Sequence, residues 1–187
     1  IFGAEIVSPG TARVTVYADK VLLGSPSGTA DPETIRMVCS HLNDAGIPSA
    51  VTEDITSSLW GKVLYNCSLN ALGAILNVPY GRLAETEEIM ELIHGIIREV
   101  FAVARAKGVR LPYGDADHYF RVLTEQQLPP TSSHRSSMLQ DLARGSRTTE
   151  IDSLNGAISA YGRQLGISTP LNDAVRAIIK AIETTSR

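Results

Sequence analysis

Residues 54–82 read DITSSLWGKVLYNCSLNALGAILNVPYGR, a stretch that predicts one long helix. Between Ile55 and Gly81 it holds a single charged side chain, Lys62. On a helix at about 100° per residue, its polar and small residues fall within roughly one quarter of the circumference. This stripe comprises Lys62, Asn66, Asn70, Gly73 and Asn77, and the opposite side carries Trp60, Leu64, Cys67, Ala71 and Ile75. A mostly apolar helix is a buried helix, so the polar stripe is either a packed polar seam or the wall of a cleft.

The composition is that of an ordinary globular chain. Its 187 residues suit one sizeable domain or slightly more. Hydrophobic residues make up 43% and charged residues 20%, with a formal net charge of -3, which favours a soluble protein. No basic patch stands out and aromatic residues are few, so neither nucleic acid nor an anionic membrane is an expected partner. No window reaches about 18 uninterrupted apolar residues, and no membrane span is predicted.

The cysteines indicate the compartment of the protein, and the first residue bears on whether the chain is a fragment. Cys39 and Cys67 lack CxxC spacing and lie in apolar helical contexts. Buried free thiols suit a reducing compartment, so we expect a cytoplasmic protein, with a disulfide as the alternative. The histidines show no metal-ligand spacing. The chain begins at Ile1 within strand-like sequence and shows no signal peptide, so we expect a fragment whose N-terminal part has been removed.

Residues 1–25 predict β-structure, and the remainder predicts helices. Residues 12–17 and 21–23 are two short β-rich runs that we expect to form an antiparallel edge. The predicted helices cover about residues 31–45, 54–79, 86–107, 115–124, 138–144, 151–165 and 169–184. Asp31 and Thr169 are expected N-caps followed by proline, and Gly46 and Gly166 are expected C-caps. The fold class is therefore mainly α, with a strand segment at residues 1–28 and a helical domain at residues 29–187.

Lys62 is the first candidate for chemistry. A lone lysine on a mostly apolar helix is costly to bury without polar partners. Lysine can act as a general acid or a Schiff-base nucleophile, whereas an ammonium extended to solvent is only structural. Asn66 and Asn70 lie one and two turns further on. They either bind a polar ligand, such as a carboxylate or carbonyl, or form a network between helices.

Two predicted helix starts carry further polar candidates. Ser136 and Ser137 can cap the helix that follows them or help to hold an anion. Thr149 and Asp152 have the spacing of a capping box, and Glu150 between them can complement the helix dipole. The chain has no G-x-S-x-G, P-loop or G-x-G-x-x-G sequence, so it is not expected to bind a dinucleotide phosphate alone.

Four motifs in this order and spacing resemble one family. They are Leu59-Trp60-x-Lys62-x-x-x-Asn66-x-x-x-Asn70, Ser136-Ser137-Met138-Leu139-Gln140-Asp141, Thr149-Glu150-Ile151-Asp152-x-Leu154-Asn155-Gly156 and Gly166-x-x-x-Pro170. Across about residues 10–185 the chain resembles the C-terminal domain of the ketopantoate reductase (2-dehydropantoate 2-reductase) family. The resemblance implies an all-helical domain of the 6-phosphogluconate-dehydrogenase-C-terminal-like type. It also implies an N-terminal Rossmann domain that binds NADP, of which residues 1–28 would be a remnant and linker.

The same resemblance implies the chemistry, which is the NADPH-dependent reduction of ketopantoate to pantoate in pantothenate and coenzyme A biosynthesis. Lys62 matches the catalytic lysine, which donates a proton to the keto oxygen. Asn66 and Asn70 match amides that line the substrate site, and Ser137 matches a serine that holds the substrate carboxylate. Glu150 matches an acidic residue beside the substrate and the nicotinamide, which makes it a candidate cofactor contact as well.

Two positions depart from the family pattern, and the alternatives stay open. His134 stands where family members often carry an asparagine, and Tyr80 stands near a position where an amide can line the pocket. The chain is therefore a ketopantoate reductase domain, a domain of another 2-keto acid or opine-type reductase, or a non-enzymatic helical interaction domain. The expected partners are a small 2-keto acid, the Rossmann domain of the same protein and a second copy in a homodimer. The chain alone is expected to be inactive.

Overall fold

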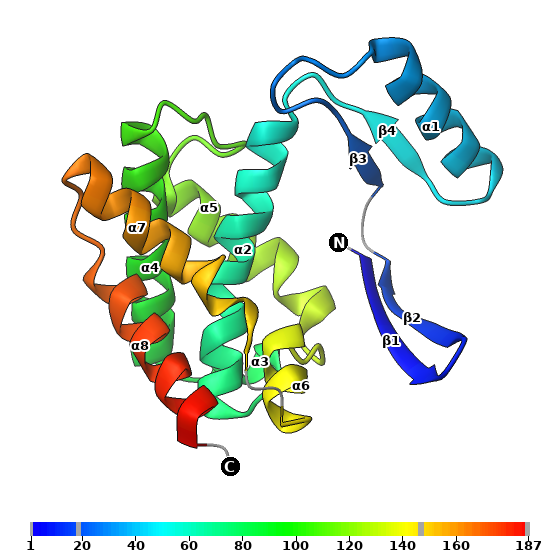
Figure 1. Ribbon diagram of the computed structural model, residues 1–187. Helices are drawn as coiled ribbons and strands as arrows, with labels where there is room; N and C mark the ends of the chain where they lie inside the picture. The colour runs from blue at the N-terminus through cyan, green and yellow to red at the C-terminus, as the bar shows by residue number, and fades with distance from the viewer. Residues whose placement is uncertain (1, 18–19, 146–147, 186–187) are drawn as a thin grey trace. The chain divides into compact units, whose positions relative to one another are not determined.

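The structure, a computed structural model, describes residues 2–17, 20–145 and 148–185 of the chain. The chain divides into two compact units, Ile1–Leu59 and Trp60–Arg187. Strands occur in the first unit, and the described part of the second is built from helices and turns (Figure 1). The predicted mainly helical fold is confirmed. No helix within the described ranges is long and apolar enough to cross a membrane.

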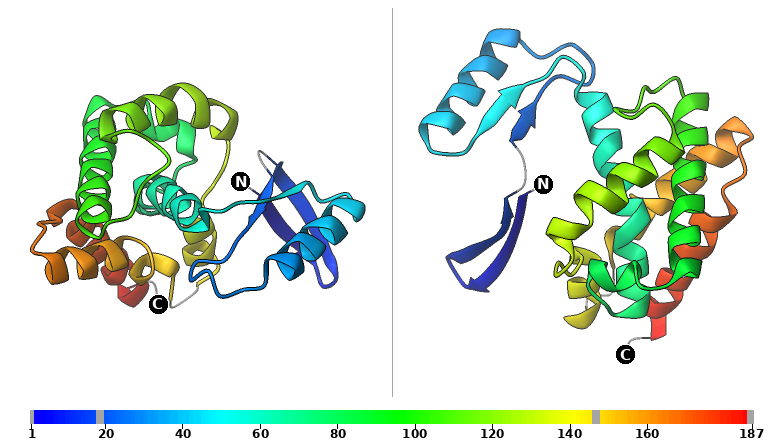
Figure 2. Two further views of the ribbon diagram at one scale, coloured as in Figure 1. Left: turned by 90° about the horizontal axis from the view of Figure 1, so that it is seen from above. Right: turned by 180° about the vertical axis from the view of Figure 1, so that it is seen from behind.

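The first unit contains two small sheets. Strands β1 (Phe2–Ser8) and β2 (Thr11–Tyr17) pair antiparallel, and Gly10 between them has a φ of 80°, which glycine adopts without strain. Strands β3 (Val21–Leu23) and β4 (Ser49–Val51) pair in parallel, with α1 (Pro32–Asp44) between them in sequence (Figures 1 and 2). The predicted pairing of residues 12–17 with 21–23 is therefore wrong. Residues 1 and 18–19 of the predicted β segment lie outside the described ranges.

Helix α1 belongs to the first compact unit, together with these strands. As predicted, Asp31 caps α1 and Gly46 follows its end with a positive φ of 77°. At that end the Asn43 side chain donates to the Ser49 carbonyl at 3.1 Å and accepts from the Ser49 N–H at 3.0 Å. These bonds join the helix to β4, which explains why the first unit extends to residue 59.

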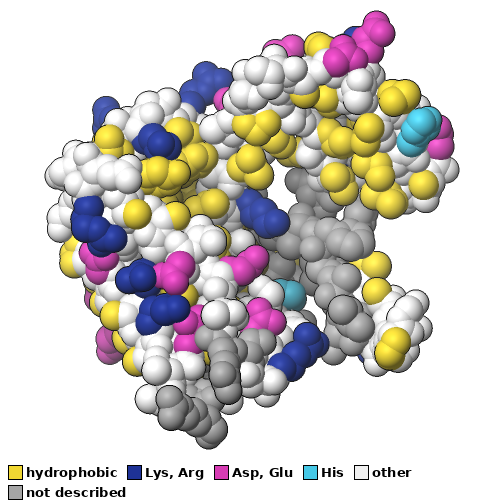
Figure 3. All heavy atoms as spheres, in the orientation of Figure 1, with side chains coloured by type: hydrophobic (Ala, Val, Ile, Leu, Met, Phe, Trp, Pro, Cys, Tyr) yellow, Lys and Arg dark blue, Asp and Glu magenta, His cyan; other side chains and the backbone are white. Residues whose placement is uncertain are grey.

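The outer surface of α1, β3 and β4 is rich in exposed apolar side chains, which Figure 3 shows gathered over these elements. They are Leu22, Met37, Val38, Ile47 and Val51, each between 39% and 53% exposed. Parallel sheets are ordinarily larger and covered on both faces. This two-stranded sheet and its helix therefore leave exposed apolar side chains of the kind that larger parallel sheets cover.

The second unit packs around α2 (Ile55–Leu76). Its other elements are α3 (Tyr80–Leu83), α4 (Glu87–Ala106), α5 (Ala116–Val122), the π-turn η1 (Leu123–Gln127), the 3-10 turn η2 (Pro129–Thr131), α6 (Ser137–Ala143), the 3-10 turn η3 (Glu150–Asp152), α7 (Asn155–Leu165) and α8 (Pro170–Thr185). Helices α4, α7 and α8 lie side by side, and α5 packs on α4 (Figures 1 and 2).

The predicted buried side of α2 is confirmed, because Leu64, Cys67 and Ala71 are fully buried. Asp54 starts the helix by accepting a hydrogen bond from the Ser57 N–H at 2.9 Å. The helix ends three residues earlier than predicted. Residue 77 adopts a left-handed φ of 54°, a conformation that asparagine tolerates better than most residues. Both cysteines of the chain are buried free thiols, as expected.

Helix α8 is capped from a distant part of the chain. The carboxylate of Glu99 on α4 accepts from the N–H groups of Leu171 at 2.8 Å and Asn172 at 2.9 Å. The hydroxyl of Thr169, the predicted cap, makes no hydrogen bond to the described residues. The cap lies 72 residues away in sequence, so no local pattern reveals it.

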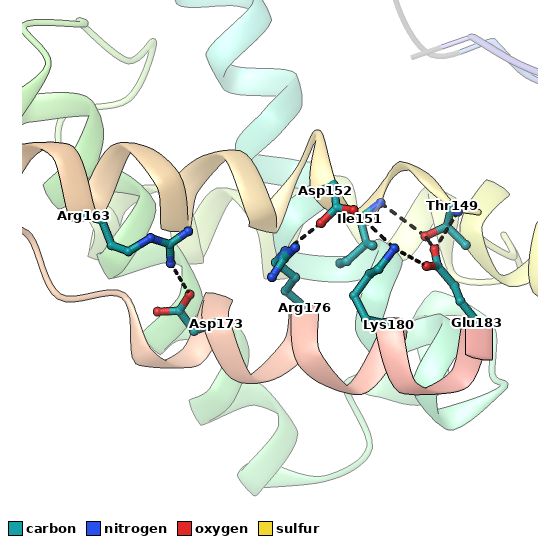
Figure 4. Close-up of polar contacts among 8 residues, drawn as sticks. All are labelled: Thr149, Ile151, Asp152, Arg163, Asp173, Arg176, Lys180 and Glu183. Carbon is teal, nitrogen blue, oxygen red and sulfur yellow. Dashed lines mark hydrogen bonds and ion pairs between the residues drawn. The ribbon is translucent and has the colours of Figure 1, made fainter. Parts of the chain in front are cut away.

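A polar network holds η3 against α8 (Figure 4). Glu183 accepts from the N–H and hydroxyl of Thr149 at 2.7 and 2.8 Å, and Lys180 approaches its other oxygen at 2.6 Å. Asp152 pairs with Arg176 at 2.6 Å and with Lys180 at 3.3 Å. The predicted capping box is therefore wrong, because the Thr149 N–H bonds to Glu183 and not to Asp152.

Glu183 should make a pH-dependent contribution to stability. Burial alone would raise the pKa of its carboxyl, but hydrogen bonds from Lys180 and Thr149 outweigh burial and hold the pKa below the ordinary 4.5. The stabilisation is then fully present above pH 4.5 and is lost as the pH falls through the folded-state pKa. We expect Glu183→Gln to lower the free energy of unfolding by about 1–3 kcal/mol at neutral pH, measured by urea unfolding, and the difference from wild type to shrink in acid.

Asp173→Asn is the matched control on the same helix. Asp173 pairs with Arg163 at 3.1 Å, and both side chains are well exposed (Figure 4). Exposed ion pairs contribute little, so the loss should not exceed about 1 kcal/mol. Equal losses in the two variants, or a loss at Glu183 that does not depend on pH, would contradict this account of the network.

The register of α8 is tested by two adjacent isoleucines. Ile179 is fully buried and Ile178 is 45% exposed. Ile179→Ala should cost about 2–5 kcal/mol of unfolding free energy because it leaves a cavity, whereas Ile178→Ala should cost well under half as much. Calorimetric melting of the two variants checks this, and a larger loss at Ile178 would show that the helix is rotated.

Candidate functional site

The predicted stripe lies on one side of α2 from Lys62 to Gly73, whereas Asn77 follows the end of the helix, and the exposure of the stripe changes along α2. Lys62, Asn66 and Asn70 follow one another at one-turn intervals, so they share a face. The Lys62 side chain is exposed, Asn66 is half-buried and Asn70 is only 5% exposed. The stripe is therefore a packed polar seam at its Asn70 end and an open surface at its Lys62 end.

Lys62 is available to bind a group from outside the chain. It makes no hydrogen bond or ion pair with any described residue. By contrast, Lys180 pairs with two carboxylates and Lys107 lies over the ring of Tyr161, 4.1 Å from its centroid. Because no described acidic side chain neutralises Lys62, its ammonium can donate to a polar or negatively charged oxygen.

Both oxygens of Asn70, the side-chain Oδ1 and the backbone carbonyl, accept hydrogen bonds. The hydroxyl of Tyr80 donates to Asn70 Oδ1, and the hydroxyl of Ser136 donates to the Asn70 backbone carbonyl at 3.1 Å. Asn70 Nδ2 has no acceptor among the described residues. Among the described residues, the buried side-chain atoms without a hydrogen-bond partner are Asn155 Oδ1 and Ser159 Oγ, and Asn70 Nδ2 is not one of them. Nδ2 is therefore an accessible hydrogen-bond donor.

The structure separates the roles of the two adjacent serines. Ser136 is fully buried and is the N-cap of α6, accepting from the Leu139 N–H at 3.1 Å. Its bond to Asn70 joins residues 66 positions apart, which local sequence patterns do not reveal. Ser137 is exposed, and its hydroxyl makes no bond to a described residue. Ser136 thus anchors the loop to α2 and leaves the Ser137 hydroxyl free.

Glu150 lies on a turn that is tied to α2. Its side chain is exposed, and its carboxylate has no hydrogen-bond or ion-pair partner within the described ranges. Asn155, at the start of α7, donates to the Cys67 carbonyl of α2 at 3.2 Å. Ile151 and Leu154 join the same core cluster as the buried side of α2. No described contact joins Glu150 directly to the residues of the stripe.

Tyr80 and His134, the two departures from the family pattern, contact one another. Their ring centroids are 5.2 Å apart in an edge arrangement, and the Tyr80 N–H donates to the His134 carbonyl at 3.0 Å. Burial raises the pKa of Tyr80 far above its ordinary value, and the neighbouring Tyr65 raises it further. Burial also lowers the pKa of His134 below 6.5. Both side chains are therefore neutral near pH 7.

Gly24 is not placed to hold a phosphate, and the described part of the chain contains no metal cluster. A Cβ added to Gly24 would lie 2.7 Å from both Ile55 Cβ and the Thr52 carbonyl, so this glycine packs against the protein and not around a phosphate. No group of three or more His, Cys, Asp or Glu side chains there is placed to hold a metal.

A hollow of about 450 Å³ lies between the end of α4 and the start of α5. Its lining includes Phe101, Arg105, Arg110 and Tyr113, but none of the predicted site residues. The candidate site is therefore defined by the free polar groups beside α2.

Comparisons with known proteins identify the family of the chain. Residues 54–183 match the family described as ketopantoate reductase PanE/ApbA C terminal. The chain is 40% identical over 183 residues to the 2-dehydropantoate 2-reductase of Aquifex aeolicus (strain VF5), an alignment that covers 98% of this chain and 58% of that protein.

Two solved structures are also similar to this chain. A PanE/ApbA family ketopantoate reductase from Ralstonia eutropha JMP134 is 32% identical with a TM-score of 0.84, covering 100% of this chain and 58% of that one. A D-mandelate dehydrogenase solved with NADH and anilino(oxo)acetate is 26% identical with a TM-score of 0.85, covering 100% of this chain and 59% of that one. The chain thus spans less than two thirds of the length of these relatives. From the family match and the helical fold, the chain belongs to the ketopantoate reductase family and corresponds to its C-terminal domain.

Proposed function

We propose that this chain is the substrate-binding part of an NADPH-dependent reductase that converts 2-dehydropantoate (ketopantoate) to pantoate, on the route to pantothenate and coenzyme A. The observation that carries the proposal is the unpaired Lys62 ammonium, placed one turn from Asn66 and two turns from Asn70. The relatives named 2-dehydropantoate 2-reductase support the reaction class.

Lys62 acts as the general acid. When a ketone is reduced, its oxygen gains negative charge as the carbon accepts a hydride, so a fixed cation and an amide donor at that oxygen lower the barrier. Lys62 Nζ donates the proton to this oxygen, and the half-buried Asn66 supplies an additional polar contact beside it. A reduced nicotinamide, bound by a separate nucleotide-binding domain, supplies the hydride.

The remaining free groups orient the substrate. Asn70 Nδ2 and the Ser137 hydroxyl are donors without partners in the described structure, and they suit the carboxylate of a 2-keto acid. The unpaired Glu150 carboxylate accepts from a substrate hydroxyl on the side where the nicotinamide binds. The Ser137 and Glu150 side chains are free because a neighbour takes the structural role, Ser136 for Ser137 and Asp152 for Glu150.

A Rossmann domain of the same protein binds the cofactor and completes the substrate site. The exposed apolar side chains over α1, β3 and β4, on an incomplete parallel sheet, support such a partner. In this proposal residues 1–28 belong to the edge of that domain and its linker. NADP is the proposed cofactor, although one structural relative was solved with NADH. Rates with NADPH and NADH decide between them. A homodimer in the cytoplasm remains our expectation for the whole protein.

A second candidate is a reductase of a different 2-keto acid. The D-mandelate dehydrogenase relative, solved with anilino(oxo)acetate, favours it, as do the aromatic Tyr80 and imidazole His134 at positions where amides were expected. A panel of ketopantoate, aliphatic 2-keto acids and aromatic 2-keto acids, assayed with the complete enzyme, separates the two. The highest kcat/KM identifies the substrate, and no turnover of any of them would leave a non-enzymatic interaction domain.

The role of Lys62 predicts a selective loss of turnover. In the complete enzyme, Lys62→Met should lower kcat by about 10²–10⁴-fold, because proton donation in the transition state is lost. The loss of NADPH absorbance measures the rate. Lys107→Met removes a surface lysine whose ammonium lies over the ring of Tyr161, and it should leave kcat unchanged. An unchanged kcat in Lys62→Met would rule out the acid role.

Glu150 and Asp152 form a second matched pair. Glu150→Gln should raise KM for the keto acid about three- to tenfold with little effect on melting, because its carboxylate is free to bind substrate. Asp152→Asn should instead lower the melting temperature slightly and leave KM unchanged, because Asp152 pairs with Arg176 and Lys180. Identical effects of the two changes would mean that Glu150 is structural.

A further inference from the structure

A buried hydrogen bond joins Tyr80 to Asn70. The Tyr80 hydroxyl donates to Asn70 Oδ1 at 2.5 Å, and the two residues are only 2% and 5% exposed. An asparagine amide has an acceptor at one end and donors at the other, and its neighbours decide which way it points. The Tyr80 hydroxyl has no other acceptor within the described structure. Oδ1 must therefore face the phenol, and Nδ2 must face away from it.

The Tyr80 side chain is fixed in place by its surroundings. The rings of Tyr65 and His134 pack against it, with centroids 5.9 and 5.2 Å away at interplanar angles of 78° and 60°. The next residue, Gly81, donates to the Ser132 carbonyl at 2.8 Å. A Cβ on Gly81 would lie 2.9 Å from Ser132 Cβ, so the close backbone approach requires glycine. The phenol therefore cannot swing away from Asn70 without loss of this packing.

The Tyr80 hydroxyl is also a permanent donor. Burial raises the pKa of Tyr80 well above its ordinary value, so the phenol stays protonated throughout the physiological range. The backbone carbonyl of Asn70 accepts from Ser136 Oγ at 3.1 Å. With both oxygens of Asn70 occupied, Nδ2 is the group that remains for a ligand, and it requires an acceptor such as a carboxylate or carbonyl oxygen.

We infer that Tyr80 is a positioning residue of the proposed reductase, whose hydroxyl locks the Asn70 amide so that Nδ2 meets an oxygen of the 2-keto acid. The inference rests on the proposed function. Tyr80 acts through Asn70 and does not touch the substrate. A flipped amide would present Oδ1 to the substrate oxygen and repel it. Because this contact exists in the ground state and the transition state alike, its loss raises KM more than it lowers kcat.

Tyr80→Phe tests the inference, because it keeps the ring packing and removes only the hydroxyl. In the complete enzyme we expect KM for the 2-keto acid to rise about five- to tenfold, with kcat within about threefold of wild type and KM for NADPH unchanged. Asn70→Ala should raise KM at least as much. Adding Tyr80→Phe to Asn70→Ala should have no further effect, because Tyr80 acts only through Asn70. Additive effects of the two changes on KM would overturn the inference.

Tyr65→Phe is the control. Tyr65 is also buried and packs against Tyr80, but its hydroxyl lies 3.0 Å from Thr131 Oγ1 and not near Asn70. Removing the Tyr65 hydroxyl should lower the melting temperature about as much as Tyr80→Phe does, and it should leave KM for the 2-keto acid unchanged. An equal rise of KM in both phenylalanine variants would make the effect of Tyr80 a packing effect and overturn the inference.

A readout that does not depend on turnover separates this inference from the proposed function. In ¹⁵N-labelled protein, the side-chain amide signals of Asn70, assigned by their loss in Asn70→Ala, should shift or broaden in Tyr80→Phe and stay in place in Tyr65→Phe. Unchanged signals in Tyr80→Phe would overturn the locking role even in an active enzyme. Changed signals in a protein that neither binds nor reduces any 2-keto acid would uphold the lock and refute the proposed function.

Discussion

The burial of α2 is the constraint on which the second unit depends. A helix that is apolar on most of its surface must be surrounded, and the neighbouring helices and turns do this along its Leu64–Cys67–Ala71 side. Burial also requires that polar groups on the helix find partners. At the Asn70 end they are found in Tyr80 and Ser136. At the Lys62 end no described residue supplies one, and the helix is open there.

The same rule shapes the elements around α2. Glu99 supplies the acceptor that the first turn of α8 lacks, and Glu183 accepts the N–H of Thr149 before η3. Each of these acids serves the backbone of another element, so a change at either one acts at a distance in sequence. Asn155 Oδ1 and Ser159 Oγ are the exceptions, since both are buried without a partner. No contact in the described structure accounts for them.

Local chemistry explains which parts of the fold were predictable. The starts of α1 and α4, the capping by Asp31 and the left-handed Gly46 and Gly166 follow from residues adjacent in sequence. The capping box at Thr149 and the strand pairing of residues 12–17 were wrong for the opposite reason. Several partners can satisfy the same N–H group or strand edge. The Thr149 N–H finds its acceptor 34 residues away in Glu183, and residues 21–23 pair with the distant residues 49–51 and not with residues 12–17.

Only part of the candidate site could be predicted from the sequence, for the same reason. Helical periodicity predicted that Lys62, Asn66 and Asn70 share a face. It did not reveal that exposure falls from Lys62 to Asn70, because burial depends on the helices packed around them. The roles of Ser137 and Glu150 came from the family resemblance. Their availability could be seen only when Ser136 and Asp152 were found to take the structural bonds.

The proposed reaction requires Lys62 to contact the oxygen of the keto group that is reduced. A crystal structure of the complete enzyme with NADP⁺ and ketopantoate, or the best 2-keto acid of the panel, would show whether it does. We expect Lys62 Nζ within about 3.2 Å of the keto oxygen and Asn70 Nδ2 within about the same distance of a substrate oxygen. A keto acid bound with its carbonyl away from α2, while Lys62 remains in solvent, would contradict this role of Lys62.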